Sequence, residues 1–297
     1  MLREISTILA DPVTKESLKL IQEKFVGNHV TEGKLISSAN EYEIKEGIAD
    51  LIPKKEDLKI NSNVLITWED LQKNGKEVYE KFPKFNCSVA SRTETQLYKK
   101  FCSFHGKVLD VGCGPSVPGY LQNNENIDFA IGIDPLIPNR VEKLYENIDL
   151  MRALAEFLPF KDKTFDIVSF ATSFDHVIEP EIVLKESIRV LKNDGIISFW
   201  IEDDPKQKSI LERAVNKGKR ILFSTMSKEA RIETMDVKKQ EEIIRSMKIP
   251  PGAIDVFHLR NYHYSKFDYL CQTFNLTKIS EERVDSVKSV FVKYKLK

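Results

Sequence analysis

The sequence predicts an α/β fold, an open and mostly parallel sheet with helices on both faces. Three apolar runs support this prediction, at residues 108–111, 129–133 and 165–170, and each is followed by glycine or polar residues. Short apolar runs bounded in this way are typical of buried strands. The amphipathic stretch 181–191 has helical spacing, and helices that alternate with such strands favour a parallel sheet.

The first of these runs ends in the turn Gly112-Cys113-Gly114, where the backbone can approach a ligand with no side chain in between. The second run ends at Asp134, about 20 residues further on, which is the spacing that open α/β sheets use for nucleotides. In such sites the acid accepts hydrogen bonds from ribose hydroxyls. The sequence therefore predicts a nucleotide or nucleoside site. Glycines that serve only the geometry of the turn are the alternative.

The ligand is not expected to be a dinucleotide. Gly114 is followed by Pro115, Ser116, Val117 and Pro118 before Gly119. The two prolines disfavour a helix start that would face a pyrophosphate. Asp110 stands two residues before Gly112 and suits a cationic ligand.

Residues 108–114, Val-Leu-Asp-Val-Gly-Cys-Gly, resemble the first motif of class I S-adenosylmethionine-dependent methyltransferases. The resemblance implies a Rossmann-like sheet of seven strands, with one antiparallel strand near its edge, and S-adenosylmethionine as the cofactor. It places the glycine turn against the methionine part of the cofactor and the acid after the second strand on the ribose. The cofactor-binding residues that it implies are Asp110, Gly112, Cys113, Gly114, Asp134, Pro135, Ala155, Glu156 and Thr172.

Residues 155–160, Ala-Glu-Phe-Leu-Pro-Phe, followed by Phe-Asp-Ile-Val at 165–168, resemble the subfamily that contains quinone-biosynthesis and glycan methyltransferases. The resemblance implies that the backbone beside Ala155 and Glu156 meets the adenine. Leu154 stands where many relatives carry a polar side chain, so that contact is expected to be missing here. A packed turn is the alternative reading.

The end of the fourth strand carries Asp175 and His176, an adjacent acid and imidazole. Ligands of open α/β sheets bind beyond the carboxyl ends of the strands, so this pair should face the crevice. Because histidine titrates near neutral pH, His176 can act as a general base on an acceptor. A histidine that only holds the following loop is the alternative.

Residues 256–264 are rich in histidine and tyrosine and resemble the segment that contacts the acceptor in related enzymes. The candidate acceptor residues are His258, Arg260, Tyr262 and His263. Two histidines here could bind a metal together with a carboxylate, but the ligand set is incomplete and no metal is predicted. Residues 203–255 are expected to form a basic helical lid, within a methyltransferase domain over 106–297.

Residues 1–55 resemble the small zinc-ribbon-like domain that activates, or is fused to, several methyltransferases. The resemblance rests on Pro-x-x-Lys-x-x-Leu at 12–18 and on the closing stretch 42–53. Asp11, Thr14, Ser37 and Ser38 stand where such domains place cysteines, so a version without zinc is expected. An unrelated β-hairpin extension is the alternative. Residues 56–105 are predicted to form a helical cap over the cofactor.

Composition limits the choice of acceptor. The chain has 45 Lys plus Arg and 45 Asp plus Glu, so no overall positive field would recruit nucleic acid. No apolar stretch reaches the roughly 18 residues that span a bilayer, and the four cysteines form no C-x-x-C pair, which suggests reduced thiols in a cytoplasmic protein. We expect methyl transfer to an oxygen or nitrogen of a small molecule or saccharide. RNA methylation and a non-catalytic, cofactor-binding partner protein are the alternatives.

Overall fold

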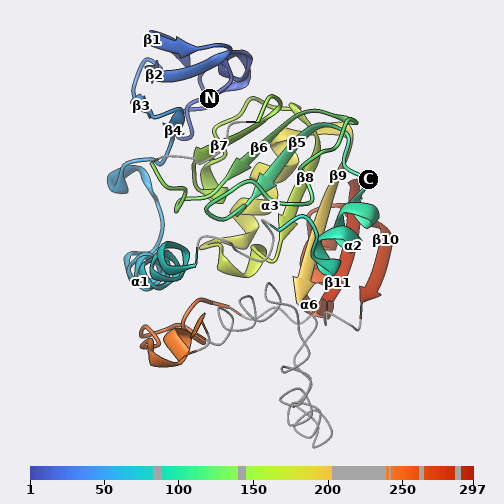
Figure 1. The fold of residues 1–297 in the computed structure, drawn as a ribbon. Coiled ribbons are helices and arrows are strands. Elements are labelled where there is room, and N and C mark those ends of the chain that lie inside the picture. The colour runs from blue at the N-terminus through green and yellow to red at the C-terminus, as the bar shows by residue number, and fades with distance from the viewer. Residues whose placement is uncertain (83–88, 140–144, 203–238, 241, 261–263, 285–288) are drawn as a thin grey trace, which may run out of the picture.

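The computed structural model describes residues 1–82, 89–139, 145–202, 239–240, 242–260, 264–284 and 289–297. These residues form a single sheet of eleven strands in the order β1-β2-β3-β4-β7-β6-β5-β8-β9-β11-β10. In Figure 1 the strands β1–β4 lie at one end of the molecule, and β10 and β11 lie at the other. The strands are β1 (Lys19–Val26), β2 (His29–Ile36), β3 (Glu41–Lys45), β4 (Ile48–Asp50), β5 (Gly106–Val111), β6 (Ile127–Ile133), β7 (Ile148–Arg152), β8 (Phe165–Ala171), β9 (Leu191–Glu202), β10 (Leu276–Val284) and β11 (Ser289–Leu296).

The predicted count of seven strands is wrong for the sheet as a whole, because the N-terminal strands continue it. β4 pairs in parallel with β7 through Ala49↔Met151 and Asp50↔Arg152, which joins β1–β4 to the edge of the other strands. Those others are seven in number, ordered β7-β6-β5-β8-β9-β11-β10. Among them β11 runs antiparallel to both of its neighbours, as expected for one strand near the edge.

The central strands are apolar on both faces, which explains why they read as continuous apolar runs. In β5, Leu109 and Val111 belong to one hydrophobic cluster and Val108 belongs to another. Since successive side chains of a strand point to opposite faces, the two clusters are the two sides of the sheet. Residues of α3 (Pro180–Val190) pack into the first cluster and residues of α2 (Thr93–Cys102) into the second. Helices therefore cover both faces, as predicted.

Two further helices are α1 (Ser62–Lys81) and α6 (Tyr264–Thr273). The described residues 239–240 and 242–246 are helical as well. Asn61 caps α1, because its side chain accepts a hydrogen bond from the backbone NH of Asn63. The stretch after β6 has no helix in its described residues 135–139 and 145–147. Pro135 and Pro138 explain this, since each lacks an NH and restricts the residue before it. Of the expected lid, residues 203–238 and 241 lie outside the described residues.

A buried carboxylate joins two turns among the N-terminal strands. Asp11 is fully buried. It accepts hydrogen bonds from Ser37 Oγ at 2.6 Å, Asn40 Nδ2 at 2.9 Å and Tyr42 OH at 3.2 Å. The turn at Asp11 is thereby tied to the turn between β2 and β3.

Candidate functional site

A cavity of about 400 Å³ opens at the carboxyl edge of the sheet, where ligands of open α/β folds bind. Its walls come from α1 and from the segments that follow β5, β6, β7 and β8. They include Tyr79 of α1, the turn 112–114, Asp134, residues 153–156, and residues 171–173 and 175–177 with His258. The cavity therefore gathers residues that are far apart in the sequence.

The glycine turn after β5 can only be built from small residues. Gly112 has φ +75°, and a Cβ there would lie 2.4 Å from Cβ of Ser173, on the segment after β8. Ser173 Oγ donates a hydrogen bond of 2.5 Å to the carbonyl of Val111, which fixes this close approach. Gly114 has φ +76°, and the nearest atom to its hypothetical Cβ is Tyr79 OH at 3.6 Å. The turn thus presents bare backbone to the cavity.

Cys113, between these glycines, also lines the cavity, but burial raises the pKa of its thiol far above the usual range. A thiol held neutral in this way is a poor nucleophile. Cys102 and Cys271 are likewise free and buried, and Cys87 lies outside the described residues.

Asp134 links the ends of β5 and β6 inside the cavity. Its carboxylate accepts hydrogen bonds from the backbone NH of Gly114 at 3.0 Å and of Leu136 at 2.8 Å. Burial raises the pKa of this carboxyl to about 6, although both hydrogen bonds oppose the shift. Each carboxylate oxygen has a second lone pair, so the group can still accept hydrogen bonds from a ligand. Pro135 lies beside it on the cavity wall.

Asp110 is not at the ligand cavity, contrary to the expectation that it faces a cationic ligand. Its side chain is fully buried, and its Oδ2 accepts a hydrogen bond of 2.8 Å from Tyr120 OH. Burial raises the pKa of this carboxyl to about 7, against hydrogen bonding from Tyr120 and Ser169. Tyr120 itself lines the cavity, so Asp110 acts on the site only through that side chain.

Ala155, Glu156 and Thr172 line the cavity as well. Oε1 of Glu156 accepts the backbone NH of Ile178 at 2.6 Å and of Glu179 at 3.1 Å, immediately before α3 begins. Burial raises the pKa of this carboxyl. Thr172 has φ +56°, an unfavourable backbone conformation for a β-branched residue. Such outliers concentrate at functional sites.

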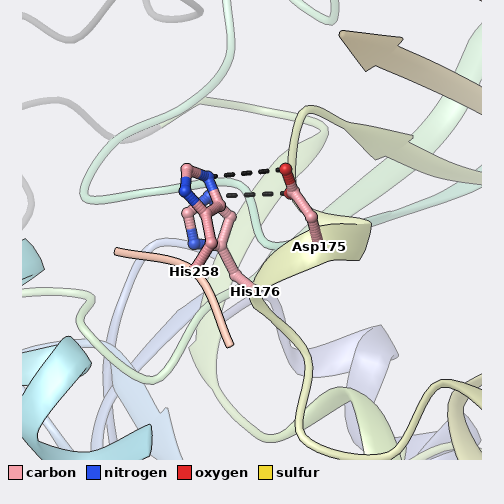
Figure 2. Close-up of side chains that lie close together, drawn as sticks. All are labelled: Asp175, His176 and His258. Atoms are coloured by element: carbon pink, nitrogen blue, oxygen red, sulfur yellow. Dashed lines mark ion pairs between the residues drawn. The ribbon is translucent and has the colours of Figure 1, made fainter. Parts of the chain in front are cut away.

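At the other end of the cavity, two histidines face one carboxylate (Figure 2). His176 Nε2 lies 3.7 Å from Asp175 Oδ1, and His258 Nε2 lies 3.4 Å from Asp175 Oδ2. The two imidazole rings lie side by side, with centroids 4.4 Å apart. The sequence separates His258 widely from the other two, and the fold brings it onto them.

Each imidazole makes a polar contact through its Nδ1 atom, which leaves Nε2 on the side of Asp175. His176 Nδ1 lies 3.2 Å from the carbonyl oxygen of Phe257, and His258 Nδ1 lies 2.7 Å from Asp255 Oδ2. Trp68 of α1 adds a hydrogen bond of 3.0 Å from its Nε1 to the carbonyl of His176. Burial lowers the pKa of His176, while the neighbouring Asp175 raises it. Both Nε2 atoms are left to face the carboxylate.

The other predicted acceptor residues do not join this group. Arg260 does not line the cavity: its guanidinium donates to the carbonyl of Ile178 and lies 3.8 Å from a carboxylate oxygen of Glu179. Tyr262 and His263 lie outside the described residues. Sequence reasoning missed Ser173 and Asp255. The spacing Asp255-x-x-His258 was the available signal for Asp255, because an acid three residues before a histidine can reach its ring.

Part of the chain is similar to known methyltransferases. The family model for a methyltransferase domain matches residues 109–199. The uncharacterized protein MJ1252 of Methanocaldococcus jannaschii is 34% identical over 133 residues, 42% of this chain and 51% of that protein. The ubiquinone/menaquinone biosynthesis C-methyltransferase UbiE of Campylobacter jejuni is 30% identical over 99 residues, 31% of this chain and 42% of that protein. The chain thus spans about half the length, or less, of these curated relatives.

Among solved structures, PH0226 from Pyrococcus horikoshii aligns with 74% of this chain and 99% of its own, at a TM-score of 0.47 and 22% identity. A likeness of this degree carries no argument about function. Within the described residues, no helix is both long and apolar enough to cross a membrane.

The residues of the cavity fit the cofactor that this family uses. The cavity volume of about 400 Å³ is in the range of small-molecule sites. Gly112 and Gly114 leave room for a ligand against the backbone, and the carboxylate of Asp134 can accept ribose hydroxyls. Residues 109–199 therefore combine the sequence pattern of a methyltransferase domain with a cavity that fits its cofactor. That cofactor is S-adenosylmethionine.

Proposed function

We propose that this chain transfers a methyl group from S-adenosylmethionine to an oxygen or nitrogen of a small-molecule or saccharide acceptor. One observation carries the proposal. The group of Asp175, His176 and His258 lines the same cavity as the glycine turn and Asp134. A site for the cofactor and a pair of titratable imidazoles thus share one enclosed space, as methyl transfer to a protic acceptor requires.

The chain's own residues would bind the cofactor, orient the acceptor and exclude water. Asp134 would hold the ribose, the turn 112–114 would lie along the methionine part, and Trp68 and Tyr79 of α1 cover the cavity. Bound S-adenosylmethionine supplies a methyl group that its own sulfonium activates. The protein then has to hold the acceptor atom in line with that methyl group, a matter of proximity and orientation.

His176 is the proposed acceptor of the proton that the substrate atom loses. Its Nδ1 lies against the carbonyl of Phe257, so the ring would carry its proton there and leave Nε2 free to accept another. Burial lowers the pKa of His176, which favours this neutral form near neutral pH. Asp175 would stabilise the imidazolium that forms.

The first test is methyl transfer from isotope-labelled S-adenosylmethionine into fractionated extract of the native cell. We expect label in small molecules or glycan, with the methyl group assigned by NMR to an oxygen or nitrogen. Because the UbiE relatives are named C-methyltransferases, label on carbon is the informative contrary outcome for the acceptor atom. Label in RNA would overturn the proposed acceptor, and cofactor binding without transfer to any fraction would overturn the enzymatic role.

A second test separates binding from chemistry. His176→Ala should lower turnover by about 100-fold or more, the size of a general-base contribution, and leave the affinity for S-adenosylmethionine unchanged. His105→Ala is the matched control, because His105 is exposed and remote from the cavity lining. Unchanged turnover in His176→Ala would remove this histidine from the mechanism.

A further inference from the structure

We infer that Asp175, His176 and His258 form a binding site for one divalent transition-metal ion at the acceptor end of the cavity. The three side chains offer two imidazole nitrogens and one carboxylate oxygen, all within 4.8 Å of one another. Imidazole and carboxylate are the ligands that Zn²⁺ takes in open sites with three protein ligands.

The spacing of these atoms suits an ion better than it suits hydrogen bonds. The separations of 3.4 Å and 3.7 Å between Asp175 and the two Nε2 atoms exceed the usual length of a hydrogen bond. Ligand atoms around a tetrahedral zinc ion at bond lengths of about 2.1 Å lie about 3.4 Å apart. The two separations between Asp175 and the histidines are thus close to those that a shared ion would impose, and all three ligand atoms lie within 4.8 Å of one another.

The groups that contact the two histidines also favour a bound metal ion. A histidine that binds a metal through one nitrogen almost always donates its other ring NH to a carboxylate or a backbone carbonyl, which fixes the tautomer. His258 does this with Asp255, whose Oδ1 also accepts the backbone NH groups of Phe257 and His258 at 2.8 Å and 2.9 Å. His176 does it with the carbonyl of Phe257. Both Nε2 atoms are therefore left with lone pairs toward Asp175.

Charge and access agree with an ion as well. One carboxylate and two neutral imidazoles leave a net charge of about −1 in the first layer, and the carboxylate of Asp255 stands behind it. All three ligand residues line the cavity, so an ion would have a path to enter and a remaining coordination position open to the acceptor side. That position fits water or a hydroxyl-bearing acceptor. His176 Nε2 would bind the ion in place of a proton, so the two uses of this atom exclude each other.

The proposed metal site is inferred from the geometry alone. Only a role of the ion in binding the acceptor rests on the proposed methyl transfer. The test uses the full chain, freed of metal by a chelator and titrated with Co²⁺ while the visible absorption of the ion is recorded. Zn²⁺ is then added to displace it. We expect one equivalent of Co²⁺ with the intense bands of a tetrahedral site, and displacement by one equivalent of Zn²⁺.

The variants assign the ligands. Asp175→Asn and His258→Gln keep the size of the side chains and should each weaken binding of Zn²⁺ by about 100-fold or more, and Asp255→Asn by about 10- to 100-fold. His105→Ala is the matched control and should bind like the wild type. Circular dichroism checks that each variant is folded. Absence of saturable binding at one equivalent in the wild type overturns the inference, and so does wild-type affinity in folded His258→Gln.

Calorimetry with S-adenosylmethionine on the metal-free chain separates the two proposals. Cofactor binding without metal binding overturns the ion site alone. Metal binding without cofactor binding overturns the proposed methyl transfer alone.

Discussion

Gly112 and Ser173 approach so closely that a Cβ on Gly112 would lie 2.4 Å from Cβ of Ser173. The contact joins the turn after β5 to the segment after β8, and the hydrogen bond from Ser173 Oγ to Val111 fastens it. The first of these segments builds the cofactor side of the cavity and the second carries Asp175 and His176. Their relative position therefore depends on the absence of a side chain at residue 112.

Gly112→Ala should disrupt both stability and cofactor binding. The substitution combines an unfavourable left-handed backbone with a clash against Ser173, so we expect a loss of about 3 kcal/mol or more in the free energy of unfolding. Affinity for S-adenosylmethionine should fall at least tenfold in the molecules that remain folded. Denaturant unfolding and calorimetry measure the two effects.

Gly27→Ala is the matched control, because Gly27 has φ +58° and no atom lies within 4 Å of its hypothetical Cβ. It carries the backbone strain without the clash, and we expect a loss of about 1 kcal/mol and normal cofactor affinity. Equal effects of the two substitutions would show that the approach to Ser173 is not what requires glycine.

Asp134→Asn should weaken binding of S-adenosylmethionine by about 10- to 100-fold, the worth of a hydrogen bond to a charged group. In the wild type the affinity should also fall as the pH drops through about 6, because the buried carboxyl then takes up a proton. The asparagine variant should lose this pH dependence. Calorimetry over a pH series measures both effects.

Asp128→Asn is the control for this prediction, since Asp128 is exposed and lies on β6, the strand that Asp134 directly follows. A pH dependence that survives in Asp134→Asn would assign it to another group.

The sequence was sufficient to predict the central strands and the glycine turn beside the cavity. The runs at β5, β6 and β8 are apolar because both faces of these strands are covered. The glycines after β5 predict a turn whose backbone is accessible to a ligand. The side-chain direction of Asp110 could not be predicted in the same way. An acid next to a glycine turn can point into the cavity or into the core, and the hydroxyl of Tyr120 decides for the core.

Contacts between segments that are far apart in the sequence could not be predicted, for a different reason. β4 has only three residues, and its junction with β7 consists of two residue pairs, too short for a recognisable pattern. The meeting of His258 with Asp175 also depends on the path of a distant segment. Local patterns specify elements, whereas contacts between remote elements depend on edges and packing that no single stretch records.

Asp110 should make the stability of the protein fall as the pH rises. In the native state its carboxyl keeps a proton up to about pH 7, whereas its ordinary pKa is 3.8. Between these values the native state binds more protons than the unfolded chain, so the free energy of unfolding decreases with increasing pH. Asp110→Asn removes this contribution, and its stability relative to the wild type should improve by about 1 to 3 kcal/mol from acidic to mildly alkaline pH.

Urea unfolding at a series of pH values measures this difference, with Asp128→Asn as the exposed control on a neighbouring strand. A difference between wild type and Asp110→Asn that stays constant with pH would contradict the raised pKa.

The carboxylate of Asp11 should stabilise the N-terminal strands. Asp11→Ala leaves the donors of Ser37, Asn40 and Tyr42 without their common acceptor. We expect a loss of about 3 kcal/mol, because several hydrogen bonds to one charged group are lost together and the hydroxyl of the buried Tyr42 is among the donors. Hydrogen exchange should rise first in β2 and β3, which the turn at residues 37–40 connects, and later in β5 and β8.

The pH dependence of this loss has the opposite sign to that of Asp110. Burial alone would raise the pKa of Asp11, but hydrogen bonds from Ser37, Asn40 and the backbone of Val13 and Thr14 hold it below the ordinary value of 3.8. Stability from this group is therefore present above about pH 4 and is lost as the pH falls below that value. The difference between wild type and Asp11→Ala should shrink in acid, while Asp128→Ala should show no such change. A loss that is the same at pH 3 and pH 7 would mean that the ionised carboxylate is not what joins the two turns.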